Sequence, residues 1–224
     1  QLKRPGLWDK TTRATQDRIN RVIPERVHEI VTGAVQQMTR GLLAGSEWTT
    51  ARPLTEGALQ EREARVRARV ELYRTTASVE GGVAGAGGFL MAAADFPALM
   101  AIKVKMLFEI AALYGYSGRD LKERVIVLRI FQLAFSSARH RPEALAALEA
   151  AMRAPHDPDA LKTFDWRKFQ LEYRDYIDVA KLAQLLPLVG APIGAVVNWR
   201  LTQRLAETAM NAYRLRLLAD QDAA

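Results

Sequence analysis

The chain contains no cysteine, and that absence excludes two classes of structure. Without thiols, the protein can build neither a disulfide scaffold nor a Cys-ligated zinc or iron–sulfur site. Histidine is also scarce, with three residues in 224, so a metal site would have to depend on carboxylates. We therefore expect no metal and no cofactor, and the composition suits a reducing compartment.

Short motifs that mark common enzyme classes are missing as well. The glycine run at residues 81–88 is not a phosphate-binding loop, because a G-x-G-x-x-G reading from Gly85 places Leu90 at the last glycine. The sequence at His28 lacks the second histidine of an H-E-x-x-H zinc motif, because Thr32 occupies that position. A G-x-S-x-G nucleophile elbow is absent too. No catalytic residue can be assigned on these grounds.

Acidic residues are fewer than basic ones, 25 against 32, which gives a formal charge of +7. A basic protein is attracted to nucleic acid, to anionic membrane surfaces and to acidic partners. Nucleic acid is the least favoured partner, because the arginines of residues 61–69 are interleaved with glutamates. Such a mixed face is typical of solvent exposure. It also places Glu63 four residues before Arg67, an order that favours an ion pair.

What the chain has in quantity is apolar residues at helical spacing. Hydrophobic residues make up 49% of the chain, enough for a globular core. No segment is better explained as a strand, so the predicted class is all-α, a multi-helix bundle. The length fits a single domain, residues 1–224, with residues 1–23 as a peripheral N-terminal helix. Further helices are expected near residues 24–40, 55–78, 79–94, 96–114, 120–138, 143–152, 165–177 and 193–218.

The most apolar stretch, residues 79–116, is also the richest in glycine. Gly81, Gly85 and Gly88 fall on one helical face, although each glycine costs about 1 kcal/mol relative to alanine inside a helix. Close approach of a second backbone is the usual compensation for that cost. We expect either a tightly packed helix or one broken at Gly88 and its neighbour, in a glycine-rich central hairpin. A second small-residue segment carries Gly190 and Gly194 and is expected to pack in the same way.

Charged residues interrupt this apolar stretch and form the candidate functional cluster. Asp95 is expected to cap the helix that follows it, with a functional role as the alternative. Lys103, Lys105 and Glu109 flank the apolar face of that helix, and Asn198 joins the cluster from the last helix. If these groups are buried together, their pKa values would be shifted as those of catalytic groups are.

Residues 81–102 are long enough to span a membrane, but their composition does not suit a membrane-spanning helix. The segment could cross the ~30 Å hydrocarbon layer as one helix. Asp95 and Pro97 lie inside it, and a central carboxylate costs about 2.5–3.5 kcal/mol on insertion scales. Two helices divided at Asp95 are therefore expected. A hairpin that partly enters a bilayer and a basic face that rests on anionic lipid remain alternatives to an ordinary bundle core.

Two segments resemble the EcsC family. The first runs from Glu80-Gly81-Gly82 to Ala93-Ala94-Asp95-Phe96-Pro97, followed by Ile110-Ala111 and Tyr114-Gly115-Tyr116. The second comprises Leu186-Pro187-Leu188-Val189-Gly190, then Ile193-Gly194 and Asn198. The likeness covers the chain from about Pro24 onward. Pro192 departs from the pattern and leaves open whether the last helix begins before or after it.

The resemblance implies an α-helical bacterial protein without an established catalytic activity. The family's namesake is encoded beside an ABC transporter linked to secretion and membrane physiology. Membership brings no catalytic residues with it, but it draws attention to Asp95 and Asn198, which lie in the recognisable motifs.

The expected function is a non-enzymatic helical module at the inner membrane surface, with anionic lipid or a membrane-protein partner such as an ABC transporter or secretion component. The alternative is a hydrolase or small-ligand-binding protein with a buried acid–base cluster near Asp95. A purely structural interaction domain is the third reading. The expected location is the cytoplasm, with peripheral attachment to the inner membrane as the open variant.

Overall fold

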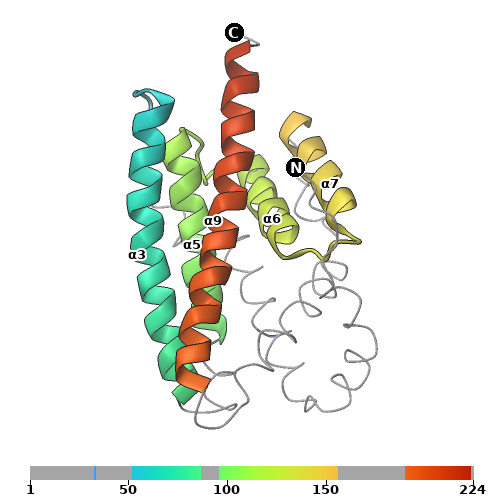
Figure 1. The fold of residues 1–224 in the computed structure, drawn as a ribbon. Helices are drawn as coiled ribbons and strands as arrows, with labels where there is room; N and C mark the ends of the chain where they lie inside the picture. The colour runs from blue at the N-terminus through green and yellow to red at the C-terminus, as the bar shows by residue number, and fades with distance from the viewer. Residues whose placement is uncertain (1–32, 34–51, 87–95, 156–189, 223–224) are drawn as a thin grey trace.

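The described part of the chain is built from α-helices packed as a bundle, as predicted (Figure 1). The computed structural model describes residues 33, 52–86, 96–155 and 190–222. No strand occurs within these residues. The helices are α3 (Leu59–Ala86), α5 (Phe96–Tyr114), α6 (Leu121–Phe135), α7 (Arg141–Arg153) and α9 (Gly190–Asp222). Apart from residue 33, the helices expected at residues 1–40 and 165–177 lie outside the described residues, as does the bend of the glycine-rich hairpin.

The two longest helices, α3 and α9, lie side by side and run in opposite directions (Figure 1). Two contacts fix their register, because Glu63 meets Arg214 near one end and Arg74 meets Trp199 further along. α5 packs against both helices and runs parallel to α9. α6 packs between α9 and α7, so α7 closes the opposite side of the bundle.

The core lies where α5 and α6 meet α9 and α3. Leu107, Ile110, Ile126 and Leu205 are each fully buried. Each such side chain contributes about 1.5–3 kcal/mol relative to an exposed one. α6 is apolar nearly all round and is central in the bundle, as predicted for such a helix. Its Arg124 is buried as well, and donates to the carbonyl of Gly118 at 3.1 Å.

α3 begins later than its sequence pattern indicated, at Leu59 instead of Thr55. Gly57 has a φ of +106°, which an α-helix does not allow. The residues before it form a strap that crosses the end of α5, where the Leu54 N–H donates to the Ala112 carbonyl at 2.8 Å. Arg62 fixes the strap by donating to the carbonyls of Leu54 and Gly57. Tertiary hydrogen bonds therefore override the helical pattern of residues 55–58.

α5 ends as predicted, at a C-terminal glycine. Gly115 has a φ of +100°, and its N–H donates to Ala112 O while that of Tyr116 donates to Ala111 O. This pair of bonds is a Schellman motif, which satisfies the last carbonyls of the helix. An added Cβ at Gly115 would lie 3.0 Å from the Arg62 guanidinium and 3.1 Å from the Leu54 carbonyl oxygen. The same glycine thus closes α5 and makes room for the strap.

The remaining boundaries show which local signals were decisive. α6 starts after Asp120, whose carboxylate accepts from the Lys122 N–H at 3.0 Å, and ends at Phe135, three residues before the predicted end. Ser136 is extended, with ψ of 143°, and stops the helix. α7 extends one to two residues beyond each end of the predicted range. α9 begins at Gly190, before Pro192. Pro192 therefore lies in the first turn, where the lack of a backbone N–H costs nothing.

Candidate functional site

Lys103 is a buried lysine in the middle of α5. Its side chain is 2% exposed, and its ammonium Nζ donates to Asn198 Oδ1 of α9 at 3.2 Å. Burial lowers the pKa of the Lys103 amine to about 8, and no carboxylate among the described residues contributes to the shift. Burying an ammonium without a counter-charge costs several kcal/mol. The structure therefore brings together two members of the predicted cluster, Lys103 and Asn198, and places them in an apolar interior.

A third buried polar side chain lies on the same face of α9. Thr202 is four residues after Asn198, which puts both on one side of the helix. Thr202 is fully buried, and its hydroxyl has no hydrogen-bond partner in the described structure. Sequence reasoning missed this residue because a single threonine among the polar residues of the last helix carries no signal of burial.

The other members of the predicted cluster do not join Lys103. Lys105 is exposed, because two residues along a helix turn the side chain to the far side. Glu109 faces α3, where it accepts from the Tyr73 hydroxyl at 2.7 Å and forms an ion pair with Arg69 at 3.0 Å. Asp95 lies outside the described residues. A convergent acid–base group of Lys103, Lys105 and Glu109 is therefore not what the helices build.

The glycines predicted to mediate close packing fall partly in the described helices. Gly81 and Gly85 lie in the last turns of α3, and Gly190 and Gly194 lie in the first turns of α9. Because α3 and α9 are antiparallel and packed together, these two ends of the helices belong to the same end of the bundle. Gly88 is outside the described residues, and the close approach of backbones there stays a prediction.

A network of carboxylates, arginines and tyrosines occupies the other end of the bundle. Glu63 of α3, predicted to lie on a solvated face, is 8% exposed and accepts from Arg214 of α9 at 2.6 Å. Its predicted ion pair with Arg67 is present at 2.8 Å, and Tyr114 donates to it at 3.4 Å. The Arg214 guanidinium is the main reason that the pKa of Glu63 is lowered.

The same network continues from α9 to α6 through a second buried carboxylate. Glu123 is 2% exposed and accepts from the Tyr213 hydroxyl and from Arg216, each at 2.5 Å. The Arg216 guanidinium lies 3.8 Å from the centre of the Tyr116 ring, and Tyr116 donates to Asp220 at 2.8 Å. Burial raises the pKa of Glu123 and of Tyr213. Every cation here is paired with a carboxylate, so the arrangement is that of a clamp between helices.

Part of this network had a sequence signal. Tyr114 and Tyr116 belong to the Tyr-Gly-Tyr motif, and both stack on Tyr213, with ring centres 5.7 and 5.6 Å apart. The two carboxylates had no sequence signal, because Glu63 and Glu123 lie in helices with many other charged residues.

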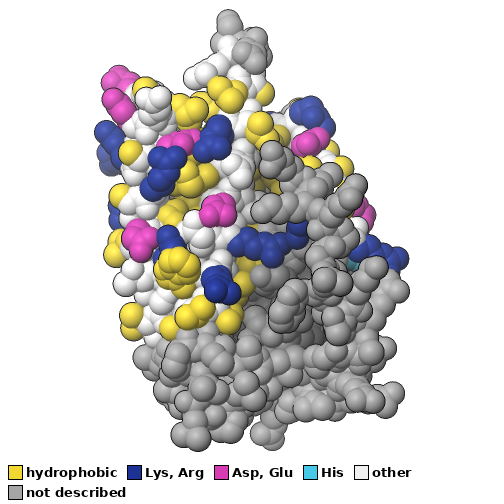
Figure 2. Space-filling model, viewed as in Figure 1, with side chains coloured by type: hydrophobic (Ala, Val, Ile, Leu, Met, Phe, Trp, Pro, Cys, Tyr) yellow, Lys and Arg dark blue, Asp and Glu magenta, His cyan; other side chains and the backbone are white. Residues whose placement is uncertain are grey.

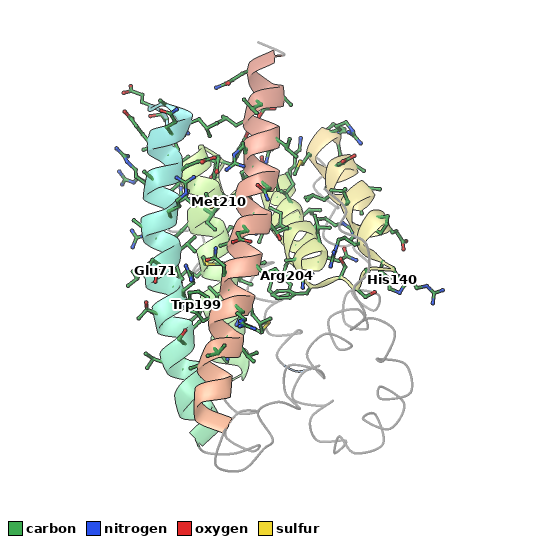
Figure 3. The ribbon with its side chains drawn as sticks, in the orientation of Figure 1. Glu71, His140, Trp199, Arg204 and Met210 are labelled. Carbon is green, nitrogen blue, oxygen red and sulfur yellow. The ribbon has the colours of Figure 1, made fainter. Side chains whose placement is uncertain are left out.

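Exposed apolar side chains gather at the end of the bundle where α3 ends and α9 begins. Val79 is 62% exposed, Val196 50% and Trp199 41%. The Arg74 guanidinium lies 3.7 Å from the centre of the Trp199 ring, and the next residue in sequence, Arg200, is exposed. Trp199 projects beside α3 in Figure 3, and Figure 2 shows hydrophobic side chains interspersed with charged ones over both helices. We call Arg74, Val79, Val196, Trp199 and Arg200 the Trp199 surface.

Two further tests of chemistry concern only the part of the chain that is described. No cluster of three or more acidic or histidine side chains there could hold a metal ion. None of the described helices combines the length and the hydropathy that crossing a membrane would require.

Comparison with known proteins identifies the family. The model of the EcsC protein family matches residues 1–218. The chain is 38% identical to Protein EcsC of Bacillus subtilis (strain 168) over 220 residues, which cover 98% of this chain and 91% of that protein. It is 32% identical to the uncharacterized protein YdbA of the same organism over 151 residues, 65% of this chain and 54% of that one. No solved structure matches. The chain belongs to the EcsC protein family.

Proposed function

We propose that this protein is a non-enzymatic helical module that attaches to an anionic membrane surface through the Trp199 surface. The observation that carries the proposal is the exposed Trp199 ring, with the Arg74 guanidinium stacked on it and Val79 and Val196 exposed at the same end of the bundle. A tryptophan combines an apolar body with a polar N–H, and it is enriched where a membrane meets water.

Charge favours lipid as the occupant of this surface. Arg200 is exposed, and an arginine near an anionic leaflet contributes about 1 kcal/mol, whereas Arg74 is already paired with Glu71 at 2.8 Å. The net charge of +7 acts in the same direction at longer range. The adjoining glycine-rich segments would deepen the contact if their hairpin enters the headgroup region, which was one of the alternatives drawn from the sequence. Because no described helix could span a bilayer, the attachment proposed is peripheral.

The family context agrees with a membrane location without specifying a partner. The family's namesake is encoded beside an ABC transporter, so a transporter or secretion component is a second candidate for the same surface. Lipid is preferred because the surface is small, carries the exposed Arg200 and is centred on one tryptophan, features that suit headgroups.

The enzyme reading receives less support from the geometry. A hydrolase near Asp95 would need an acid and a base that converge, but Lys105 is exposed and Glu109 is engaged by Tyr73. Lys103 and Asn198 are hydrogen-bonded to each other. Of the alternative function, a small-ligand site at that position is therefore the part that an observation supports.

Co-sedimentation of the full chain with vesicles tests the proposal. Vesicles of phosphatidylglycerol and phosphatidylethanolamine are compared with phosphatidylcholine vesicles, each at 50 mM and 500 mM NaCl. We expect binding to the anionic vesicles that weakens at high salt, because counter-ions screen surface charges within about 10 Å or less. W199S is expected to weaken binding about tenfold.

L215S is the matched control, since Leu215 is 66% exposed on α9 but lies at the opposite end of the bundle. It should bind as the unchanged protein does. Protein that stays in the supernatant with anionic vesicles at 50 mM salt contradicts the proposal. Equal loss of binding in W199S and L215S contradicts the assignment to the Trp199 surface.

A further inference from the structure

The interior of the bundle contains a cluster of polar groups that the membrane-binding surface does not use. Lys103 of α5 and Asn198 and Thr202 of α9 are 2%, 5% and 0% exposed. They come from two helices that run parallel and pack against each other, and the Lys103–Asn198 hydrogen bond of 3.2 Å joins them. The apolar side chains of Val104 and Leu205 are buried on the same two helices. The cluster is therefore a polar site enclosed by an apolar core.

This cluster has hydrogen-bond donors in excess of acceptors. The Lys103 ammonium has three N–H donors, and in the described structure its one partner is Asn198 Oδ1. The Thr202 hydroxyl is a further donor, and it has no partner among the described residues. Buried polar groups are paired in almost all native structures, so unpaired ones call for an explanation. The excess here consists of donors and one positive charge, which is what an acceptor with a single negative charge would satisfy.

We propose that Lys103, Asn198 and Thr202 form an internal binding site for a monocarboxylate. The two oxygens of a carboxylate accept from the free N–H groups of the Lys103 ammonium and from the Thr202 hydroxyl. The complex would be neutral, because one negative charge offsets the one positive charge of Lys103. A dianion such as phosphate would leave a net charge in the core and is disfavoured for that reason.

The chemistry of the site accounts for the low basicity of Lys103 in the unliganded protein. Burial lowers the pKa of the Lys103 amine to about 8, so the amine is charged at pH 7 and loses its proton just above neutral pH. A bound carboxylate favours the charged form and raises that pKa. Binding and protonation of Lys103 are therefore linked. The site is independent of the proposed attachment to membranes, since it shares no residue with the Trp199 surface.

The test follows the Lys103 amine by NMR in the full chain labelled with [13C]lysine, with its signal identified by its loss in K103M. Acetate and octanoate are titrated separately, with NaCl at equal ionic strength as the blank and inorganic phosphate as the dianion. We expect either carboxylate to raise the pKa of Lys103 by one unit or more, with chloride and phosphate causing no change. A response to acetate indicates a small acid, and a response to octanoate alone indicates an acid with an apolar chain.

Two threonine variants separate recognition from packing. T202V, which keeps the shape of the side chain, is expected to weaken binding of the carboxylate about tenfold. T208V is the matched control on the same helix, because the Thr208 hydroxyl already donates to the Arg204 carbonyl at 2.8 Å, and it should bind as the parent does. A Lys103 pKa that stays near 8 with both carboxylates overturns the proposal, as does an equal shift with chloride. Equal effects of T202V and T208V overturn the role of Thr202.

Discussion

The carboxylate of Glu123 on α6 lies 2.5 Å from the hydroxyl of Tyr213 on α9, although the two residues are 90 positions apart. Both side chains are buried, and Arg216 of α9 binds the second oxygen of the same carboxylate. α6 is therefore attached to α9 by a carboxylate that makes two hydrogen bonds in the core. Removing one partner of such a group is more costly than the net value of the interaction, because the other partners stay buried and unpaired.

We expect E123A to lower the free energy of unfolding by about 3–5 kcal/mol, the range found when one partner of a buried ion pair is removed. Urea unfolding followed by circular dichroism measures this loss. E149A is the control on α7, because the Glu149–Arg153 pair is exposed on both sides and 3.5 Å long. Exposed pairs contribute about 0–1 kcal/mol. A loss in E123A as small as in E149A would show that the Glu123 cluster does not hold α6 to α9.

Among the described residues, two glycines of positive φ make a second comparison. Gly115 has a φ of +100° and Gly57 a φ of +106°, so alanine is strained at both, by about 1–2 kcal/mol. At Gly115, the new Cβ would also meet the Leu54 carbonyl oxygen at 3.1 Å, which is backbone and cannot rotate away. At Gly57, the nearest atom is the end of the flexible Glu61 side chain. Thermal unfolding should therefore show a larger loss for G115A than for G57A, and the reverse order would contradict the strap.

Helical periodicity predicted the class of fold, and local signals predicted the end of α5 and the start of α6. It did not predict that α3 continues past Ser78 to Ala86, into the glycine-rich stretch. The Schellman glycine at Gly115 and the cap at Asp120 each act within one turn of the chain. The start of α3 could not be predicted in this way. It depends on Leu54 reaching Ala112 across 58 positions, a contact that no local pattern encodes.

The candidate cluster shows the same division between local and distant information. Lys103 and Lys105 were grouped by their nearness in sequence, although a step of two residues turns helical side chains to opposite sides. That error was avoidable from helix geometry alone. The partner of Lys103 required knowing which turn of α9 lies beside α5, and the burial of Glu63 required the position of Arg214. Both depend on the register of long helices, which packing of the whole core decides.

Lys103 also predicts an unusual dependence of stability on pH. The pKa of its amine is 10.5 in an unfolded chain and about 8 in the fold, so between these values the unfolded chain binds more protons. Stability from this group therefore rises as pH increases from 8 to 10.5. K103M removes the charge, and at pH 7 it should stabilise the protein by up to about 3 kcal/mol, the value of such a shift.

The difference between K103M and the parent is the quantity to measure, by urea unfolding at pH 7, 8, 9 and 10. It should shrink as pH rises, while the buried tyrosines affect both proteins equally. K105M, at an exposed position of the same helix, should differ from the parent at no pH. A constant difference between K103M and the parent would show that Lys103 is not desolvated.

Glu63 gives the opposite case, a group whose pKa is lowered by folding. The hydrogen bond from Arg214 at 2.6 Å is the main cause, opposed in part by burial. A lowered pKa stabilises the fold above the ordinary value of 4.5, and this contribution is lost as pH falls through the lowered pKa. E63Q keeps the shape but not the charge, and at pH 7 it should lose about 1.5–3 kcal/mol, the usual worth of a hydrogen bond to a charged group.

Urea unfolding of the parent and E63Q between pH 7 and pH 3 should show the two curves converging, because protonation of Glu63 makes the parent resemble the variant. E71Q, on the same helix, is the control, since the Glu71 side chain is 60% exposed and its pair with Arg74 is of the kind that contributes little. If the loss in E63Q persists unchanged at pH 3, the Arg214 contact acts through shape and not through charge. The attachment of α3 to α9 would then rest on contacts such as the stacking of Arg74 on Trp199, which no titration in this range affects.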